Sequence, residues 1–304
     1  MRIVFMGSPD FAIPSLEKLH ASSHEVVSVV SNIDKRRGRG RGTSPTPVKA
    51  KALELGLPVI EADRLDDPRF IQQLKECEAD LFVVVAFRVL PRKVLDVPAK
   101  GSVNLHASLL PKYRGAAPIH WAVMNGEKVT GCSVFFLDDR VDTGAVIKQK
   151  KIEIGPNETT GEVYDRLKEI GAAVLVEAVG EIEEDSYSLT IQDDAEATPA
   201  PKLFASDCKV DFSKPAGEVH NKIRGLSPFP TAWGELDDLR FNMYRSRIGP
   251  DVDLSPGQMS LDNTDLLVGC GEGTVILDEV QIEGKRKMSG REFMNGYSGL
   301  GVIH

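Results

Sequence analysis

Short apolar runs alternate with amphipathic stretches through the first half of the chain. The runs are strand-sized and largely apolar, and they lie at 2–6, 25–31, 57–61, 79–87, 101–106, 129–137 and 145–154. Apolar residues at helical spacing predict helices at about 9–21, 47–55, 67–76 and 160–184. Strands that are apolar along their whole length and separated by helices are typical of a parallel sheet covered on both faces. The pattern therefore predicts an α/β fold with a doubly wound, mostly parallel open sheet.

The pattern changes near residue 186. Residues 187–206 have scattered polar, Pro and Ala residues with little periodicity, which indicates a linker. Beyond them, after a predicted helix at 215–225, come short strand-like runs at 231–236, 240–246, 265–271 and 274–282, separated by Gly, Asp and Pro turns. We predict a domain at 1–186, a linker at 187–206 and a smaller β-rich domain with an OB-like barrel at 207–304.

Composition narrows the class of protein. No apolar run approaches the roughly 18 residues of a membrane-spanning helix, and the first strand breaks at Gly7 and Pro9 rather than continuing as a signal peptide. A protein without a membrane segment, located in the cytoplasm, is expected, and we expect a monomer. The four cysteines form no CxxC motif, so neither a disulfide framework nor a metal site is predicted: Cys77, Cys132, Cys208 and Cys270.

Charge is distributed unevenly along the chain. The formal net charge of −8 argues against a nucleic-acid partner, because phosphate binding depends on positive charge. Residues 35–51, however, hold seven basic residues and no acidic one. A concentrated basic segment on an acidic protein favours a local site for a polyanion, although a solvated surface loop has the same composition.

Candidate catalytic residues stand at the ends of two predicted strands. Asn104 and His106 are two positions apart on the strand 101–106, so they point to the same side, and Asp142 lies in the turn after the next strand. Ligands of open α/β sheets bind beyond the carboxyl ends of the strands. An amide donor and an imidazole there suit the stabilisation of an oxyanion and proton transfer, with the carboxylate orienting the imidazole. Each residue alone is equally typical of a turn or a packed polar side chain.

The motifs around these residues carry a family resemblance. NLHASLLPKYRGAAPIHWAV, followed by TGCSVFFLDDRVDTGAVI, resembles the folate-dependent formyltransferase family, whose catalytic Asn, His and Asp correspond to Asn104, His106 and Asp142. MRIVFMGSPDFAIPSLEKL, RGRGTSPTPVKAKALELGLPV and VDFSKPAGEVHNKIRGLSPFPTAW extend the resemblance over nearly the full length. The basic segment together with the C-terminal domain resembles the family members that act on tRNA.

The resemblance implies a reaction and its binding residues. The formyl donor would be 10-formyltetrahydrofolate, the acceptor initiator methionyl-tRNA, and no metal would be needed. Folate contacts are implied for Ser108, Leu109, Leu110, Pro111, Phe87, Arg88, Leu90 and Asp138. Contacts to tRNA are implied for Arg36, Arg37, Arg39, Arg41, Lys49, Lys285 and Lys287. One departure is that AFRVLP (86–91) is a residue shorter than the family pattern, with Arg88 in place of a Gly.

Other classes of protein share parts of this pattern. A nicotinamide dehydrogenase has the same fold class, but the first turn, GSPDF, lacks the GxGxxG that binds the pyrophosphate. The DTGA stretch resembles an aspartic protease, which needs two such carboxylates. A non-catalytic RNA-binding protein and a formyltransferase acting on a glycinamide nucleotide or an amino sugar remain alternatives. The two formyltransferase alternatives leave the basic segment joined to this C-terminal domain unexplained.

Overall fold

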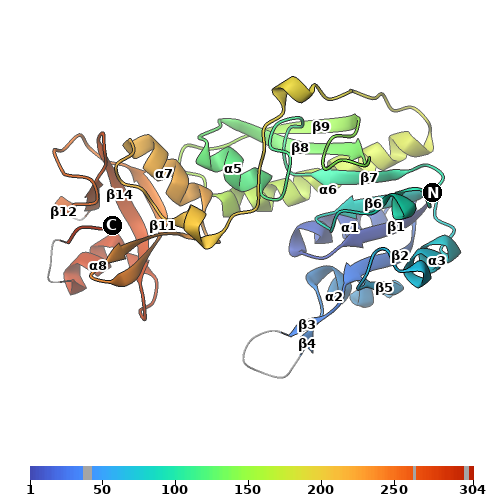
Figure 1. Ribbon diagram of the computed structural model, residues 1–304, viewed down its shortest axis with the longest axis horizontal. Helices are drawn as coiled ribbons and strands as arrows, with labels where there is room; N and C mark the ends of the chain where they lie inside the picture. Colours follow the sequence, from blue (N-terminus) through green and yellow to red (C-terminus); the bar gives the residue numbers. More distant parts are fainter. Residues whose placement is uncertain (37–42, 263–264, 298–300) are drawn as a thin grey trace. The chain divides into compact units, whose positions relative to one another are not determined.

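The computed structural model describes residues 1–36, 43–262, 265–297 and 301–304 (Figure 1). The chain divides into two compact units. The first unit comprises Met1–Gly115, Gly131–Ile152 and Asp165–Pro199, and the second comprises Ala116–Thr130, Glu153–Tyr164 and Ala200–His304. The units are therefore not two consecutive halves of the chain, because segments of both alternate between residues 116 and 199. The domain and linker limits given from the sequence stay a prediction.

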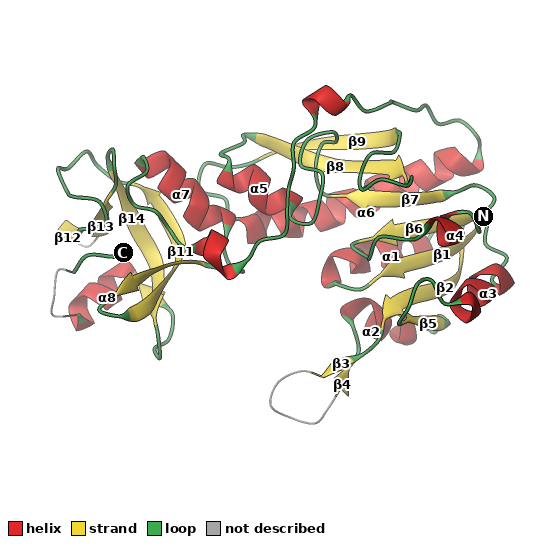
Figure 2. Cartoon of the chain, viewed as in Figure 1, coloured by secondary structure: helices red, strands yellow, loops and turns green. Residues whose placement is uncertain are grey.

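A seven-stranded sheet forms the centre of the first unit (Figure 2). Its strands are β1 (Arg2–Gly7), β2 (Glu25–Asn32), β5 (Val59–Ala62), β6 (Leu81–Val85), β7 (Ser102–His106), β8 (Val129–Phe136) and β9 (Val146–Glu153). The order is β5-β2-β1-β6-β7-β8-β9, with parallel pairing from β5 to β7 and antiparallel pairing of β7 with β8. The mostly parallel open sheet is thus confirmed. Strand order reverses between β1 and β6, so the carboxyl ends there form the edge at which α/β proteins bind ligands.

Helices connect these strands. They are α1 (Ile13–His20), preceded by a 3₁₀ turn η1 (Asp10–Ala12), α2 (Pro47–Glu54), α3 (Pro68–Glu76), α4 (Arg92–Leu95) and α6 (Thr160–Glu183), with a further 3₁₀ turn η2 (Asp194–Glu196). Local chemistry fixes their starts: α2 and α3 carry Pro in the first turn, and Thr46 and Asp67 cap them by accepting backbone N–H groups. The apolar face of α3 joins the core formed by β1 and β6, in which Leu74 packs with Val4 and Phe82.

The basic segment 35–51 is described except at residues 37–42. β3 (Lys35–Arg36) and β4 (Thr43–Ser44) pair antiparallel, between β2 and α2. Arg37, Arg39 and Arg41 lie outside the described residues, and the side chain of Arg36 is likewise not described.

The second unit is built on an antiparallel sheet of order β10-β11-β14-β13-β12, with β15 paired to β14. Its strands are β10 (Ala232–Leu236), β11 (Leu239–Ile248), β12 (Met259–Asp262), β13 (Asp265–Gly269), β14 (Thr274–Ile282) and β15 (Met288–Ser289). Its helices are α5 (Pro118–Met124), α7 (Ala216–Gly225) and α8 (Gly290–Gly296), with a 3₁₀ turn η3 (Ala205–Cys208). Phe241 and Phe293 pack edge to face in its core at a centroid separation of 5.0 Å. The predicted β-rich class is confirmed.

Within the described ranges, no helix has the length and apolar character needed to cross a bilayer.

Candidate active site

Strand β7 carries two of the predicted catalytic residues to the carboxyl edge of the sheet. Asn104 is half-buried and pairs in register with Val84 on β6 and Phe135 on β8. Its side-chain amide makes no hydrogen bond to any residue that the structure describes. A partly buried amide without an internal partner is a group suited to an external acceptor, since burying a polar group unpaired is unfavourable.

His106 ends β7 with both ring nitrogens close to acceptor groups. Nε2 lies 2.9 Å from the carbonyl oxygen of Tyr113, and since a carbonyl only accepts, Nε2 is the donor there. Nδ1 lies 3.7 Å from Oδ2 of Asp142. The side chains of His106 and Asp142 are only 7% and 11% exposed, so water screens their interaction weakly. The structure therefore brings together two groups that the sequence places 36 positions apart.

Asp142 is held by the backbone around it. Its Oδ2 accepts a hydrogen bond from the N–H of Gly115 at 2.8 Å. Its φ of 56° lies in the left-handed region, which Asp and Asn tolerate better than most residues. At Gly144, a Cβ would overlap the carbonyl oxygen of Phe136, which explains why the turn after Asp142 needs glycine.

A second layer of side chains, which sequence inspection did not identify, supports this turn. Gln192 donates through Nε2 to the carbonyl oxygens of Asp142 and Gly144 at 3.0 and 2.8 Å. Arg114 in turn donates to Oε1 of Gln192, with its closest contact at 2.8 Å, and to Asp194 at 2.8 Å. Residues 190–199 thus belong to the surroundings of the candidate site. No local motif marks them, because the partners are about 80 positions apart.

The loop after β7 is fixed by a buried serine. Ser133 on β8 donates through Oγ to the carbonyl oxygen of Ser108 at 2.6 Å and accepts from the N–H of Leu110 at 3.0 Å. Gln149 donates to the same Oγ and to the carbonyl oxygen of Leu110. Neither Ser133 nor Gln149 stood out in the sequence, although both set the shape of this loop.

The two leucines of the loop have different surroundings. Leu110 is buried against Phe135 and Val146, so its side chain belongs to the core. Leu109 is half-buried, and Gly131 leaves the space that its side chain occupies. The bond from Leu110 to Pro111 is cis. The backbone of this loop and the side chain of Leu109 are accordingly the parts available to a ligand.

The loop after β6 contains the departure from the family pattern. The Arg88 guanidinium donates to the carbonyl oxygens of Ala62 and Asp63 at 2.6 and 2.7 Å, and its buried Nε has no partner within the described chain. Burial lowers the pKa of Arg88 from its usual value. Leu90 is buried in the core and Phe87 is half-buried. Arg88 therefore turns toward the end of β5 and ties the two loops together.

Asp138 acts locally in the turn after β8. Its Oδ1 accepts from the N–H of Arg140 at 3.0 Å and from the hydroxyl of Thr143 at 2.7 Å. These bonds shape the 138–143 turn that presents Asp142.

The predicted tRNA contacts that the structure describes are paired to different degrees. Lys49 on α2 contacts Asp34 and Glu61 at 2.9 and 2.7 Å. Lys287 stands 3.5 Å from the ring centre of Tyr244. Lys285 is exposed. Among the described residues, none of these lysines pairs with Asn104, His106 or Asp142. Their role with tRNA stays a prediction.

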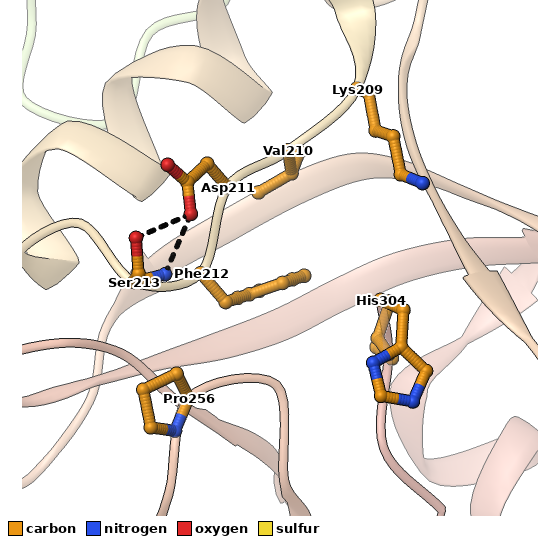
Figure 3. Close-up of a pocket in the computed structure, with 8 residues that line it drawn as sticks. Lys209, Val210, Asp211, Phe212, Ser213, Pro256 and His304 are labelled. Atoms are coloured by element: carbon orange, nitrogen blue, oxygen red, sulfur yellow. Dashed lines mark hydrogen bonds between the residues drawn. The ribbon is translucent and has the colours of Figure 1, made fainter.

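A pocket of about 430 Å³ opens in the second unit (Figure 3). It is lined by Lys209, Val210, Asp211, Phe212, Ser213, Pro256, Ile303 and His304. Asp211 accepts hydrogen bonds from the backbone N–H and the hydroxyl of Ser213, and Lys209 pairs with Glu235 at 3.1 Å. These polar groups satisfy one another, and the pocket contains none of the predicted site residues. Nowhere in the described parts of the chain do three or more His, Cys, Asp or Glu residues gather as a metal site would require.

Comparison with known proteins identifies the family of this chain. Residues 1–179 match the family described as Formyl transferase, and residues 202–298 match Formyl transferase, C-terminal domain. The chain therefore belongs to the formyl transferase family. Among its relatives is the Methionyl-tRNA formyltransferase of Porphyromonas gingivalis, 40% identical over 313 residues that cover 98% of this chain and 96% of the relative. The Methionyl-tRNA formyltransferase of Moorella thermoacetica is 43% identical over 300 residues, with 98% and 96% covered.

Solved structures share the fold at lower identity. A sugar 3N-formyl transferase, WlaRD, crystallised in the presence of dTDP and 5-N-formyl-THF, superposes with a TM-score of 0.70 at 18% identity, covering 94% of this chain and 99% of that one. HypX from Aquifex aeolicus in complex with tetrahydrofolic acid gives a TM-score of 0.66 at 17% identity, covering 97% of this chain and 47% of that one. At these identities the likeness establishes the fold.

Proposed function

We propose that the protein transfers the formyl group of 10-formyltetrahydrofolate to the α-amino group of initiator methionyl-tRNA. The observation that carries this proposal is the identity of 40 to 43% with relatives named Methionyl-tRNA formyltransferase over 98% of the chain. The basic segment 35–51 supports a tRNA acceptor, since phosphate binding depends on positive charge. A monomer located in the cytoplasm remains part of the proposal.

The chemistry forms one bond and breaks another. The amino nitrogen bonds to the formyl carbon, the bond from that carbon to the folate nitrogen breaks, and one proton passes from the amine to the released folate nitrogen. In this scheme the Asn104 amide donates to the oxygen that becomes negative in the tetrahedral intermediate. His106 takes the proton at Nδ1, because Nε2 already donates to the carbonyl oxygen of Tyr113. Asp142, 3.7 Å from Nδ1, stabilises the resulting imidazolium.

The residues around the trio suit a folate. The half-buried side chains of Phe87 and Leu109, in the loops after β6 and β7, offer apolar contact. The backbone at 86–91 and 138–142 offers donors and acceptors to a heterocycle. We assign donor binding to these loops together with Ser108, Pro111 and Asp138, and we assign to Leu90, Leu110 and Arg88 the task of holding the loop backbone.

A comparison of acceptors tests the proposal. The purified protein would be incubated with 10-formyltetrahydrofolate and, in separate reactions, methionyl initiator tRNA, uncharged tRNA, a glycinamide nucleotide and an amino-sugar nucleotide. We expect formylation of the methionyl-tRNA alone. Preferential formylation of a small amine would overturn the tRNA assignment. Binding of tRNA without any transfer would favour a non-catalytic RNA-binding protein.

A further inference from the structure

Lys49 is a half-buried lysine just after the β3–β4 pair. It lies in the first turn of α2, and its side chain is 13% exposed. Its ammonium group donates to Glu61 at 2.7 Å, at the end of β5, and to Asp34 at 2.9 Å, between β2 and β3. The hydrogen bond to Glu61, followed by the one to Asp34, raises the pKa of Lys49, so the ammonium stays charged.

Near this lysine, hydrogen bonds join the chain before β3 to the chain after β4. The hydroxyls of Ser31, on β2, and Thr46, before α2, lie 2.6 Å apart. Thr46 also accepts the N–H of Lys49, which caps α2. On the β2 side, Asn32 donates through Nδ2 to the hydroxyl of Ser8 at 2.8 Å. The chain that leaves β2 and the chain that enters α2 are therefore fastened to each other and to the carboxyl edge of the sheet.

The charges around Lys49 do not suit a phosphate contact. Two carboxylates share one ammonium group, so the cluster has a formal charge of −1. Asp34 and Glu61 are also more exposed than the lysine, at 28% and 45%, so an approaching phosphate would meet carboxylate oxygens first. The sequence prediction that Lys49 contacts tRNA conflicts with this arrangement.

We propose instead that Lys49 is a positioning residue for the acceptor, which holds the root of the β3–β4 segment by bridging Asp34 and Glu61. The inference rests on the proposed function, because it concerns the use of methionyl-tRNA. Breaking the bridge removes the partner that the two carboxylates have among the described residues, and it frees the Asp34 end of the segment. We expect acceptor binding to weaken, since within the described chain no hydrogen bond or ion pair joins His106 or Asp142 to this bridge.

The test compares variants of the lysine with variants of the two carboxylates that it bridges. KM for methionyl-tRNA and KM for 10-formyltetrahydrofolate would be measured for Lys49→Gln, Lys49→Arg, Asp34→Asn and Glu61→Gln. We expect Lys49→Gln to raise the acceptor KM on the order of tenfold, and Asp34→Asn and Glu61→Gln to raise it in the same direction. Lys49→Arg keeps the charge and the hydrogen-bond donors, so its acceptor KM should stay close to that of the wild type. The donor KM stays unchanged in all four.

Lys51 provides the matched control. It lies on the same helix and pairs with Glu17 and Glu54 at 3.1 and 3.0 Å. Neither of these ion pairs connects the chain that leaves β2 with the chain that enters α2. Lys51→Gln should change the acceptor KM by less than about twofold, as expected for a surface ion pair.

Three results would overturn the proposal. The first is a lower acceptor KM for Asp34→Asn and Glu61→Gln, together with a slope of log affinity against log salt concentration that is smaller by about 1 for Lys49→Gln. That result would mean that Lys49 contacts a phosphate directly. A rise in both KM values for Lys49→Gln would indicate general damage to the fold. An unchanged acceptor KM for Lys49→Gln would show that Lys49 does not contribute to acceptor binding. A failure of the proposed function is separate and visible beforehand, because the wild-type protein would then not formylate methionyl-tRNA.

Discussion

The substitution Asp142→Asn isolates the charge next to His106. Asn has nearly the same shape as Asp and tolerates the left-handed backbone at φ 56°. Its amide oxygen can still accept the N–H of Gly115, which donates to the Asp142 carboxylate at 2.8 Å in the wild type. The variant is therefore expected to fold normally, with the carboxylate charge as the difference.

The separation of 3.7 Å between His106 Nδ1 and Asp142 Oδ2 sets the size of the effect. Opposite unit charges at about 4 Å attract by about 4 kcal/mol at an effective dielectric constant of about 20. If His106 becomes an imidazolium in the transition state, losing this attraction raises the barrier by up to that amount. Because each 1.4 kcal/mol or so corresponds to a factor of ten, kcat should fall by up to about a thousandfold.

The assay is a single-turnover measurement of formylmethionyl-tRNA formation at saturating 10-formyltetrahydrofolate, with the thermal unfolding midpoint as a control for folding. A single turnover excludes product release from the measured rate. A folded Asp142→Asn protein whose rate stays within about tenfold of the wild type would refute the assigned role of the carboxylate.

Three further predictions concern other parts of the site. Asn104→Ala should lower kcat by about 10²–10³ in steady-state assays, because one oxyanion donor is lost, and near-normal turnover by the folded variant would contradict the assignment. Arg88→Gln should raise KM for 10-formyltetrahydrofolate on the order of tenfold, since two hydrogen bonds that hold the 86–91 loop to Ala62 and Asp63 are weakened; an effect on the tRNA KM alone would be inconsistent with this. The double variant Arg39→Glu/Arg41→Glu should weaken tRNA use and flatten its salt dependence while folate binding, measured by titration, is unchanged. Equal weakening of both substrates would argue against a direct tRNA contact.

Much of the fold follows from local sequence patterns. The largely apolar runs at 2–6 and 79–87 became β1 and β6, buried along almost their whole length, because a central parallel strand has helices on both faces. The cap residues Thr46 and Asp67, each followed by Pro, fixed the starts of α2 and α3. In the second half the short, turn-separated runs correctly predicted a β-rich domain.

The candidate site could be predicted only in part. Asn104 and His106 are found from strand periodicity, and Asp142 from its turn, because these signals are local. The groups that hold His106 and Asp142 are backbone atoms of Tyr113 and Gly115. Because every residue has such atoms, the sequence gives no sign of these contacts.

Contacts between residues far apart in the sequence could not be predicted for a related reason. Gln192 lies in a stretch of low periodicity, and its contact with the Asp142 turn depends on the path of a segment 50 positions away. Lys49 counted as part of a basic cluster in the sequence. In the structure its charge is balanced by Asp34 and Glu61, 15 and 12 positions away.

The central claim is that the cluster on β7 formylates methionyl-tRNA, and the most direct test is the rate of that reaction for the wild-type protein beside His106→Ala. Both would be given methionyl initiator tRNA and 10-formyltetrahydrofolate, and the formylated product would be measured over time. We predict product with the wild type and a rate lower by at least about 10²-fold for the folded variant. Unformylated methionyl-tRNA with the wild type, or near-equal rates for the two proteins, would contradict the claim.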